Sequence, residues 1–286
     1  MFDLAPLISA PELAHALTPG TEQDLLVIDC RFNLGNPEAG QEAYQQGHIA
    51  GAHYAHLDRD LSGPKTGRNG RHPMPSALAF QATLRSWGIT AHTRVVAYDD
   101  AGGMFAARLW WLLRWAGHEA VQVLDGGWQA WQAAQGAIDT AQPAARPASD
   151  FALNPRTDWT VSSDTVLSRL ALPAQQLIID ARAPDRFRGE NETMDPVGGH
   201  IPGARNRFFQ LNLQADGRFK PAAQLQAEFD ELLASHDLSS VTHQCGSGVT
   251  ACHNLLAMAQ AGLPPTKLYA GSWSEWCADA SRPVER

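Results

Sequence analysis

Cysteine, runs of basic residues and long apolar stretches are all scarce in this sequence of 286 residues. Its four cysteines are too few for a disulfide framework, which predicts a reducing compartment. The net charge is −8 and no basic run occurs, which argues against a nucleic-acid-binding surface. No stretch approaches the roughly eighteen apolar residues of a membrane-spanning helix, and Asp3 and Glu12 stand where a signal peptide would carry Lys or Arg. We therefore expect a soluble cytoplasmic protein without a membrane partner, acting on small molecules or other proteins.

The two halves of the chain repeat the same motifs in the same order. The paired stretches are LLVIDCRF (25–32) with LIIDARAP (177–184), GHIAGAHY (47–54) with GHIPGARN (199–206), RVVAYDDAGGMFAARLWWLL (94–113) with SVTHQCGSGVTACHNLLAM (240–258), and LDGGWQAW (124–131) with YAGSWSEW (269–276). A nearly constant offset relates the pairs, which indicates a duplication. In this alignment Asp99 stands in the place of Cys245, and Trp128 in the place of Trp273.

Each half alternates short β-rich runs with helical segments. The predicted strands lie at 25–30, 94–99 and 120–125, and then at 177–180, 241–244 and 267–269. Such alternation predicts the α/β class, with a mainly parallel sheet and helices on both of its faces. We expect one such domain over residues 1–140 and another over 159–286. The stretch 138–158 is rich in Pro, Ala and Asp, and 141–158 is predicted to be the linker.

The most informative stretch is VTHQCGSGVTACHNLLAMAQAG, residues 241–262. It predicts a strand up to Gln244, a tight loop from Cys245, and a helix from about Val249 to Gln260. Glycines in this loop allow its N–H groups to turn inward and form an anion-binding nest at the helix N-terminus. Such a site lowers a cysteine pKa from about 8.5 to roughly 3.5–7.5. A lone free cysteine is more often a small buried hydrophobe, but core packing does not require Gly-Ser-Gly after a strand, so we interpret Cys245 as a nucleophile.

The loop CGSGVTA, its helix and the later LYAGSWSEW resemble the active-site region of the rhodanese superfamily, specifically the two-domain thiosulfate and 3-mercaptopyruvate sulfurtransferases. The tandem repeat extends this resemblance over nearly the whole chain. It implies two rhodanese-like domains, an inactive first one and a catalytic second one. The loop is similar to the mercaptopyruvate branch, because thiosulfate-preferring rhodaneses typically carry Cys-Arg-Lys-Gly-Val-Thr. Tyrosine phosphatases need an arginine six residues after their cysteine, and position 251 is Ala, which disfavours phosphate chemistry.

The resemblance implies a covalent, two-step transfer of sulfur. Cys245 would take sulfane sulfur from 3-mercaptopyruvate or thiosulfate as a persulfide, and pass it to cyanide, a small thiol or a thioredoxin-like acceptor. The loop amides of Gly246, Ser247, Gly248, Val249 and Thr250 would hold the persulfide anion. Neither a metal nor an organic cofactor is expected. A sulfur carrier or sensor with little turnover of its own is the alternative from another class.

A long polar, glycine-rich stretch at 57–76 follows the first GHIxGA motif. Such a loop indicates function or disorder. The resemblance implies that it reaches the catalytic site, and that His72 and Asp58 join Ser247 in a relay that protonates the departing enolate. Asp60 is an equal alternative to Asp58, and His72 without the family match would be read as a surface histidine. We expect Thr250 to cap the following helix rather than to act on substrate.

A carboxylate donor also needs cationic recognition, for which arginine is best suited. Arg186 matches the first substrate arginine of the family, whereas the second has no counterpart in the shorter segment ETMDPVGG. Arg188 or Arg182 are the candidates to replace it. Arg182 is more readily explained as a structural partner of Asp180 or Glu275, and Arg188 as an exposed residue. Trp273 is expected either to line the pocket near Cys245 or to close the core.

Overall fold

The computed structural model describes residues 4–18, 20, 24–172, 175–234 and 236–286. The chain divides into two compact units. The first comprises Met1–Ser62, Pro75–Arg156 and Ala215–Arg218, and the second comprises Gly63–Met74, Thr157–Gln214 and Phe219–Arg286. The segment Gly63–Met74 thus belongs to the second unit although it lies in the first half of the sequence.

A parallel sheet forms the centre of the first unit. Its strands follow the order β1-β6-β5-β2-β4, and they are β1 (Leu7–Ile8), β2 (Leu25–Asp29), β4 (His53–Tyr54), β5 (Arg94–Tyr98) and β6 (Val121–Leu124). Strands β3 (His48–Ile49) and β7 (Ile138–Asp139) form a separate antiparallel pair. The predicted runs at 25–30, 94–99 and 120–125 are confirmed as β2, β5 and β6. Their mainly apolar residues suit strands that are buried on both faces.

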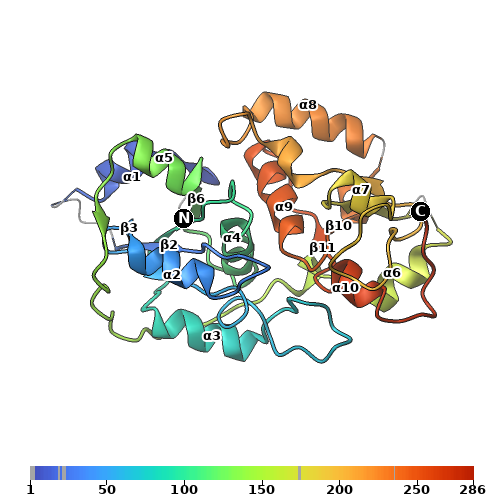
Figure 1. Ribbon diagram of the computed structural model, residues 1–286, viewed down its shortest axis with the longest axis horizontal. Helices are drawn as coiled ribbons and strands as arrows, with labels where there is room; N and C mark the ends of the chain where they lie inside the picture. Colours follow the sequence, from blue (N-terminus) through green and yellow to red (C-terminus); the bar gives the residue numbers. More distant parts are fainter. Residues whose placement is uncertain (1–3, 19, 21–23, 173–174, 235) are drawn as a thin grey trace. The chain divides into compact units, whose positions relative to one another are not determined.

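Helices flank this sheet (Figure 1). They are α1 (Ala10–Ala16), α2 (Ala39–Gln46), α3 (Ala77–Ser86), α4 (Ala106–Trp115) and α5 (Gly127–Ala133). Helices α1 and α5 share one hydrophobic cluster with the sheet, in which Leu13 and Trp131 meet Val27, Val96 and Leu124. Helix α4 is apolar nearly all round and is buried along most of its length, as expected for a helix in the interior.

The second unit repeats this architecture. Its sheet follows the order β11-β10-β8-β9, with β8 (Leu177–Asp180), β9 (Arg205–Asn206), β10 (Val241–Gln244) and β11 (Lys267–Leu268), all paired in parallel. The α-helices are α6 (Ser163–Arg169), α7 (Pro184–Phe187), α8 (Ala222–Leu233), α9 (Thr250–Gln260) and α10 (Ser272–Trp276), and the 3-10 helices are η1 (Thr157–Trp159), η3 (Phe209–Asn212) and η4 (Leu238–Ser240). The predicted strands at 177–180 and 241–244 are confirmed, and the one at 267–269 ends one residue earlier.

Each unit contains its own copy of the same buried ion pair at the end of an inner strand. In the first unit it involves Asp29, Arg31, Gly47 and Trp128, and in the second Asp180, Arg182, Gly199 and Trp273. The arginine Nη2 lies 2.6 or 2.7 Å from the carboxylate and 2.7 or 2.8 Å from the glycine carbonyl oxygen. The guanidinium lies 4.6 or 4.7 Å from the centre of the tryptophan ring. The duplication read from the sequence therefore extends to matching side-chain contacts.

The stretch predicted to be a linker packs along the first unit as far as Arg156. Three of its backbone N–H groups donate to carbonyl oxygens of that unit at 2.9–3.0 Å: Ser149 to Arg85, Asn154 to Ala116, and Arg156 to Trp115. The second unit resumes at Thr157. These bonds hold residues 149–156 against the first unit.

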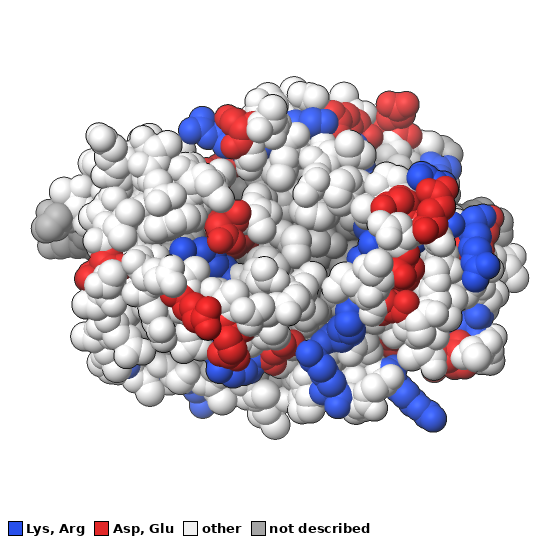
Figure 2. Space-filling model, in the orientation of Figure 1, with Lys and Arg blue, Asp and Glu red and all other residues white. Residues whose placement is uncertain are grey.

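The surface carries both kinds of charge. Figure 2 shows Lys and Arg interspersed with Asp and Glu over the face in view. Within the described ranges, no helix is long and apolar enough to cross a membrane.

Candidate active site

Cys245 stands between strand β10 and helix α9 of the second unit. Its backbone is held on both sides, because its N–H donates to Ser272 Oγ at 3.1 Å and its carbonyl oxygen accepts from the Trp273 N–H at 2.9 Å. The cysteine is buried, with 2% of its surface exposed. Strand and loop lie where the sequence predicts them, so the thiol sits at the end of an inner strand, facing the start of a helix.

Helix α9 begins at Thr250 with Val249 as its N-cap, and no side chain caps it. The expectation that Thr250 caps this helix is therefore wrong. A capping residue must precede the first helical residue so that its oxygen can reach the free N–H groups of the first turn, whereas Thr250 is already inside that turn. The first N–H groups of α9 are consequently left to another acceptor.

The loop amides around Cys245 are available for such an acceptor. Gly248 has a φ of +78°, and a Cβ at this position would lie only 2.3 Å from the carbonyl oxygen of Ala270, so only glycine fits. The N–H groups of Gly246, Ser247 and Val249 donate to no atom of the residues described here. A turn of inward N–H groups at a helix N-terminus favours an anion.

The corresponding loop of the first unit shows what such a turn can hold. Asp99 follows β5 as Cys245 follows β10, and its carbonyl oxygen likewise accepts from a tryptophan N–H, that of Trp128, at 2.8 Å. Four backbone N–H groups converge on the Asp99 carboxylate at 2.7–2.9 Å; they belong to Ala101, Gly103, Phe105 and Ala106. The first unit thus fills its loop with a carboxyl group of its own. Burial raises the pKa of Asp99, whereas the four N–H groups favour its carboxylate form, so this loop geometry suits an acceptor of several N–H bonds.

His72 and Ser247 are brought together within the second unit. His72 Nδ1 lies 2.7 Å from Ser247 Oγ, and both residues are buried. The segment that carries His72 is closed at its base by a hydrogen bond from the Gly63 N–H to the Pro73 carbonyl oxygen, at 2.9 Å. It is also fixed to α10, because the Arg71 N–H donates to Ser274 Oγ at 3.0 Å. His72 is therefore an ordered neighbour of the cysteine loop and not a surface histidine.

Asp58 and Asp60, the two candidates for the relay carboxylate, lie in the first unit. Asp60 Oδ2 accepts from the backbone N–H of His56 at 2.7 Å, and burial raises the pKa of Asp60 above its ordinary value. The N–H of Asp58 donates to His56 Nδ1 at 3.1 Å. The assignment of Asp58, with Asp60 as its alternative, stays a prediction.

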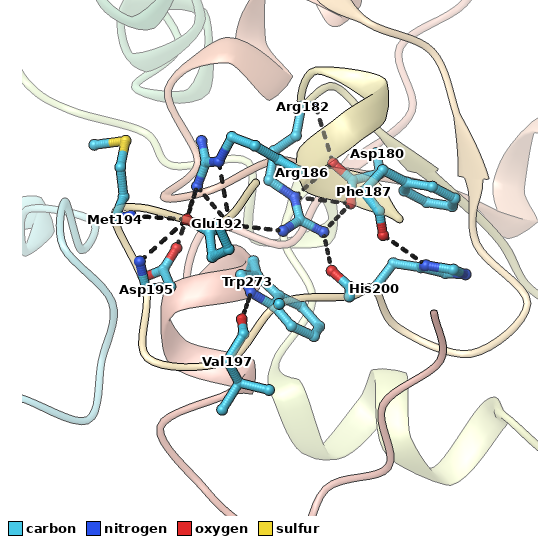
Figure 3. A network of polar contacts seen from close by, with 12 residues as sticks. Asp180, Arg182, Arg186, Phe187, Glu192, Met194, Asp195, Val197, His200 and Trp273 are labelled. Atoms are coloured by element: carbon cyan, nitrogen blue, oxygen red, sulfur yellow. Dashed lines mark hydrogen bonds and ion pairs between the residues drawn. The ribbon is translucent and has the colours of Figure 1, made fainter. Parts of the chain in front are cut away.

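Arg186, the predicted substrate arginine, lies in α7 and is engaged by two acidic side chains (Figure 3). Its Nη2 donates to Glu192 Oε1 at 2.8 Å and lies 3.4 Å from Asp195 Oδ2. Burial works against ionisation of Glu192, but hydrogen bonds from Arg186 and from the Met194 N–H outweigh it and lower its pKa. Burial raises the pKa of Asp195 despite a hydrogen bond from Arg71. Both carboxylates thus engage the guanidinium group of the predicted substrate arginine.

The other two arginines considered from the sequence are explained by structure alone. Arg182 pairs with Asp180, as predicted, and its guanidinium stacks on the ring of Trp273. Trp273 itself is fully buried in the core cluster of this unit, so of the two expectations it closes the core. Arg188 is half exposed and pairs with Glu190 at 2.7 Å.

Three residues of this region were missed by the sequence analysis: Arg71, Glu192 and Asp195. Arg71 reaches the loop after Cys245, because a Cβ built on Gly246 would lie 2.8 Å from Arg71 Nη2. Its position directly before His72 was the available signal. No pattern marked the two acidic residues, since their partners are distant in sequence or belong to an irregular loop.

The remaining cysteines are unsuited to nucleophilic chemistry. Burial raises the pKa of Cys277 to about 11 and that of Cys30 well above its ordinary value. Cys252 is fully buried, and its thiol donates to the Gly248 carbonyl oxygen at 3.3 Å. Cys245 is the only one of the four that follows an inner strand directly and precedes a glycine loop.

Comparisons with known proteins identify the family of this chain. The rhodanese-like domain family matches residues 9–134 and 162–279. The chain is 48% identical over 98% of both chains to a probable 3-mercaptopyruvate sulfurtransferase of Pseudomonas aeruginosa. It is 40% identical, over 98% of this chain and 96% of the other, to the putative thiosulfate sulfurtransferase SseB of Mycobacterium tuberculosis. The structure of 3-mercaptopyruvate sulfurtransferase from Leishmania major is similar, with 31% identity, a TM-score of 0.83, and coverage of 94% of this chain and 73% of that one. With two matching domains and full-length relatives, the chain belongs to the rhodanese family of sulfurtransferases.

Proposed function

We propose that this sulfurtransferase moves sulfur from 3-mercaptopyruvate, through a persulfide on Cys245, to a thiophilic acceptor. The observation that carries the choice of donor is the hydrogen bond between His72 and Ser247, at 2.7 Å, in the loop that holds Cys245. The relatives named as 3-mercaptopyruvate sulfurtransferases support it. A buried hydroxyl with a buried imidazole behind it suits a reaction that has to deliver a proton.

In the first half-reaction the Cys245 thiolate attacks the sulfur of 3-mercaptopyruvate. A sulfur–sulfur bond forms, the bond between that sulfur and C3 breaks, and its electron pair becomes the enolate of pyruvate. The enolate takes a proton from the Ser247 hydroxyl, which His72 restores. The thiol proton of the donor passes to His72 and replaces the one given to the enolate, so the products are pyruvate and the persulfide anion of Cys245.

In the second half-reaction an acceptor attacks the outer sulfur of the persulfide. Cyanide would leave as thiocyanate, and a small thiol or a thioredoxin-like protein would leave carrying the sulfur. The thiolate of Cys245 departs and is regenerated. Between the two steps the N–H groups of the loop at 246–249 hold the persulfide anion, which avoids the cost of placing a bare charge in a buried site.

Asp58 is proposed to orient His72 as the third member of the relay, on the strength of the family resemblance alone. Asp58→Asn and Asp60→Asn, made separately, decide between the two carboxylates. The one that serves the relay lowers kcat for 3-mercaptopyruvate with little change in KM.

Thiosulfate is the second candidate donor. It is favoured by the relative named as a putative thiosulfate sulfurtransferase and by the missing second arginine of the segment before residue 199. With thiosulfate, sulfite would leave already anionic, so no proton would be needed.

The test is steady-state transfer to cyanide, comparing kcat/KM for the two donors on one preparation of the full chain. Cys245→Ser is the blank, and a mass gain of one sulfur atom on the Cys245 peptide identifies the intermediate. A higher kcat/KM for thiosulfate would make thiosulfate, and not 3-mercaptopyruvate, the proposed donor. Full activity of Cys245→Ser would overturn the persulfide mechanism, and persulfide formation without turnover would identify a carrier.

A further inference from the structure

Two guanidinium groups flank the residue that follows Cys245. A Cβ built on Gly246 would lie 2.8 Å from Arg71 Nη2, and 3.6 Å from both Nη atoms of Arg186. Arg71 comes from the segment Gly63–Met74 and Arg186 from α7, so two separate parts of the second unit deliver positive charge to one point of the cysteine loop. A pair of arginines can grip a carboxylate with parallel N–H donors.

A carboxylate of the chain itself occupies the space between these arginines. One oxygen of Asp195, Oδ1, is paired with Arg71, and the other, Oδ2, lies 3.4 Å from Arg186 Nη2. The side chain of Asp195 is 3% exposed. Asp195 therefore bridges the two guanidinium groups and neutralises part of their charge. An incoming anion would have to displace the Asp195 carboxylate.

Asp195 is held less firmly than the neighbouring Glu192. Glu192 accepts hydrogen bonds from Arg186 and from the N–H groups of Met194 and Asp195, and pairs with Arg182 at 3.5 Å (Figure 3). These contacts lower the pKa of Glu192, whereas burial raises that of Asp195. In addition, Arg71 Nε is buried and has no hydrogen-bond partner among the residues described. Asp195 thus accepts fewer hydrogen bonds than Glu192, so of the two carboxylates it is the easier one to displace.

We propose that Arg71 and Arg186 together bind the carboxylate of the sulfur donor, and that Asp195 is a built-in competitor that the donor displaces. Arg71 then supplies the second cation that is missing from the segment 190–199. The inference rests on the proposed function for the identity of the donor. The site itself follows from the geometry alone: it takes a small monocarboxylate next to the Cys245 loop.

The test measures binding of pyruvate, which has the carboxylate and no sulfur, to the full chain by ligand-observed NMR. Arg71→Gln is expected to weaken binding by about tenfold or more, as loss of a charge-assisted pair requires. Asp195→Asn is expected to tighten it several-fold, and this gain should shrink when Arg71→Gln is also present. The matched controls are Arg68→Gln, an exposed arginine of the same segment, and Glu190→Gln, an exposed carboxylate of the neighbouring loop; both should bind pyruvate as the unmodified chain does.

Because pyruvate binding needs no turnover, its outcome is independent of the sulfur-transfer assay. The inference is overturned if the unmodified chain does not bind pyruvate, if folded Arg71→Gln binds it unchanged, or if Asp195→Asn weakens binding. Should Arg71→Gln fail to fold, Arg71→Lys replaces it. This variant keeps the positive charge but loses the parallel N–H donors of the guanidinium group, so intermediate affinity for pyruvate is expected. Unchanged affinity would contradict the proposal. Equal binding of sulfate and pyruvate would also contradict it, because the two guanidinium groups are proposed to select a planar carboxylate.

Discussion

His72 Nδ1 and Ser247 Oγ form a hydrogen bond of 2.7 Å, although 175 residues separate them in the sequence. Both side chains are buried in the second unit, next to the loop of Cys245. A hydroxyl in this setting has a fixed proton partner and little access to bulk water. Under the proposed mechanism, the pair should matter most for donors that need a proton and much less for other donors.

Ser247→Ala and His72→Gln are each expected to lower kcat/KM for 3-mercaptopyruvate by roughly 10²–10⁴-fold, the range for loss of a positioned proton donor. Activity with thiosulfate should fall far less, since sulfite leaves as an anion. The measurement is the ratio of kcat/KM values for the two donors. His92→Gln, at an exposed position of the first unit, is the control. Equal losses with both donors would assign the pair a purely structural role.

Pyruvate binding is expected to tighten as the pH falls. Asp195 competes with the ligand only as a carboxylate, and burial raises its pKa, so protonation on acidification removes the competitor. Two other titratable groups that face Asp195 keep their charge: the pKa of Glu192 is lowered, which keeps it ionised, and burial raises the pKa of Cys277 to about 11, which keeps it neutral.

The measurement is the pyruvate dissociation constant by NMR between about pH 8 and about pH 4, so that the range extends down to the ordinary pKa of an aspartate side chain. Asp195→Asn should bind tightly at all these values and lose the slope. A slope that survives in Asp195→Asn would attribute the effect to another group.

Gly248→Ala should destabilise the second unit strongly. The substitution forces an L-residue to a φ of +78° and places its Cβ 2.3 Å from the Ala270 carbonyl oxygen. Strain and overpacking together should lower the free energy of unfolding by about 3 kcal/mol or more. Gly203→Ala is the matched control: it has a φ of +75° with no atom within 4 Å, so only about 1 kcal/mol is expected. Urea denaturation of both variants measures the difference, and equal losses would show that the Ala270 contact relaxes without cost.

Asp99→Asn is expected to lower the stability of the first unit without affecting sulfur transfer. Four N–H groups converge on the carboxylate, and an amide would turn an NH₂ group toward two of them. The cost should be about 2–4 kcal/mol in the free energy of unfolding, as for buried donors left unsatisfied. Asp100→Asn, an exposed neighbour, should stay within about 0.5 kcal/mol. A normal stability for Asp99→Asn would mean that the loop does not depend on an anion.

The parts of this structure that follow from local sequence were predictable. Strands β2, β5 and β8 are largely apolar runs, and the loop at Cys245 is marked by its two glycines. The start of the helix was predicted to within one residue, but the capping role was wrongly given to Thr250, because a hydroxyl in the first turn and one at the cap look alike in sequence. The engagement of Arg186 by Glu192 and Asp195 escaped prediction for another reason: an irregular segment has no periodicity from which side-chain direction can be read.

The placement of segment Gly63–Met74 with the second unit has a consequence for how the chain can be divided. A fragment that starts at Thr157 would contain Cys245 and its loop, yet it would lack His72 and Arg71. Although the two repeats look like interchangeable modules, the second repeat alone lacks two residues that lie beside the Cys245 loop. An exchange of C-terminal halves between relatives would therefore have to include the segment Gly63–Met74 to keep Cys245 together with His72 and Arg71.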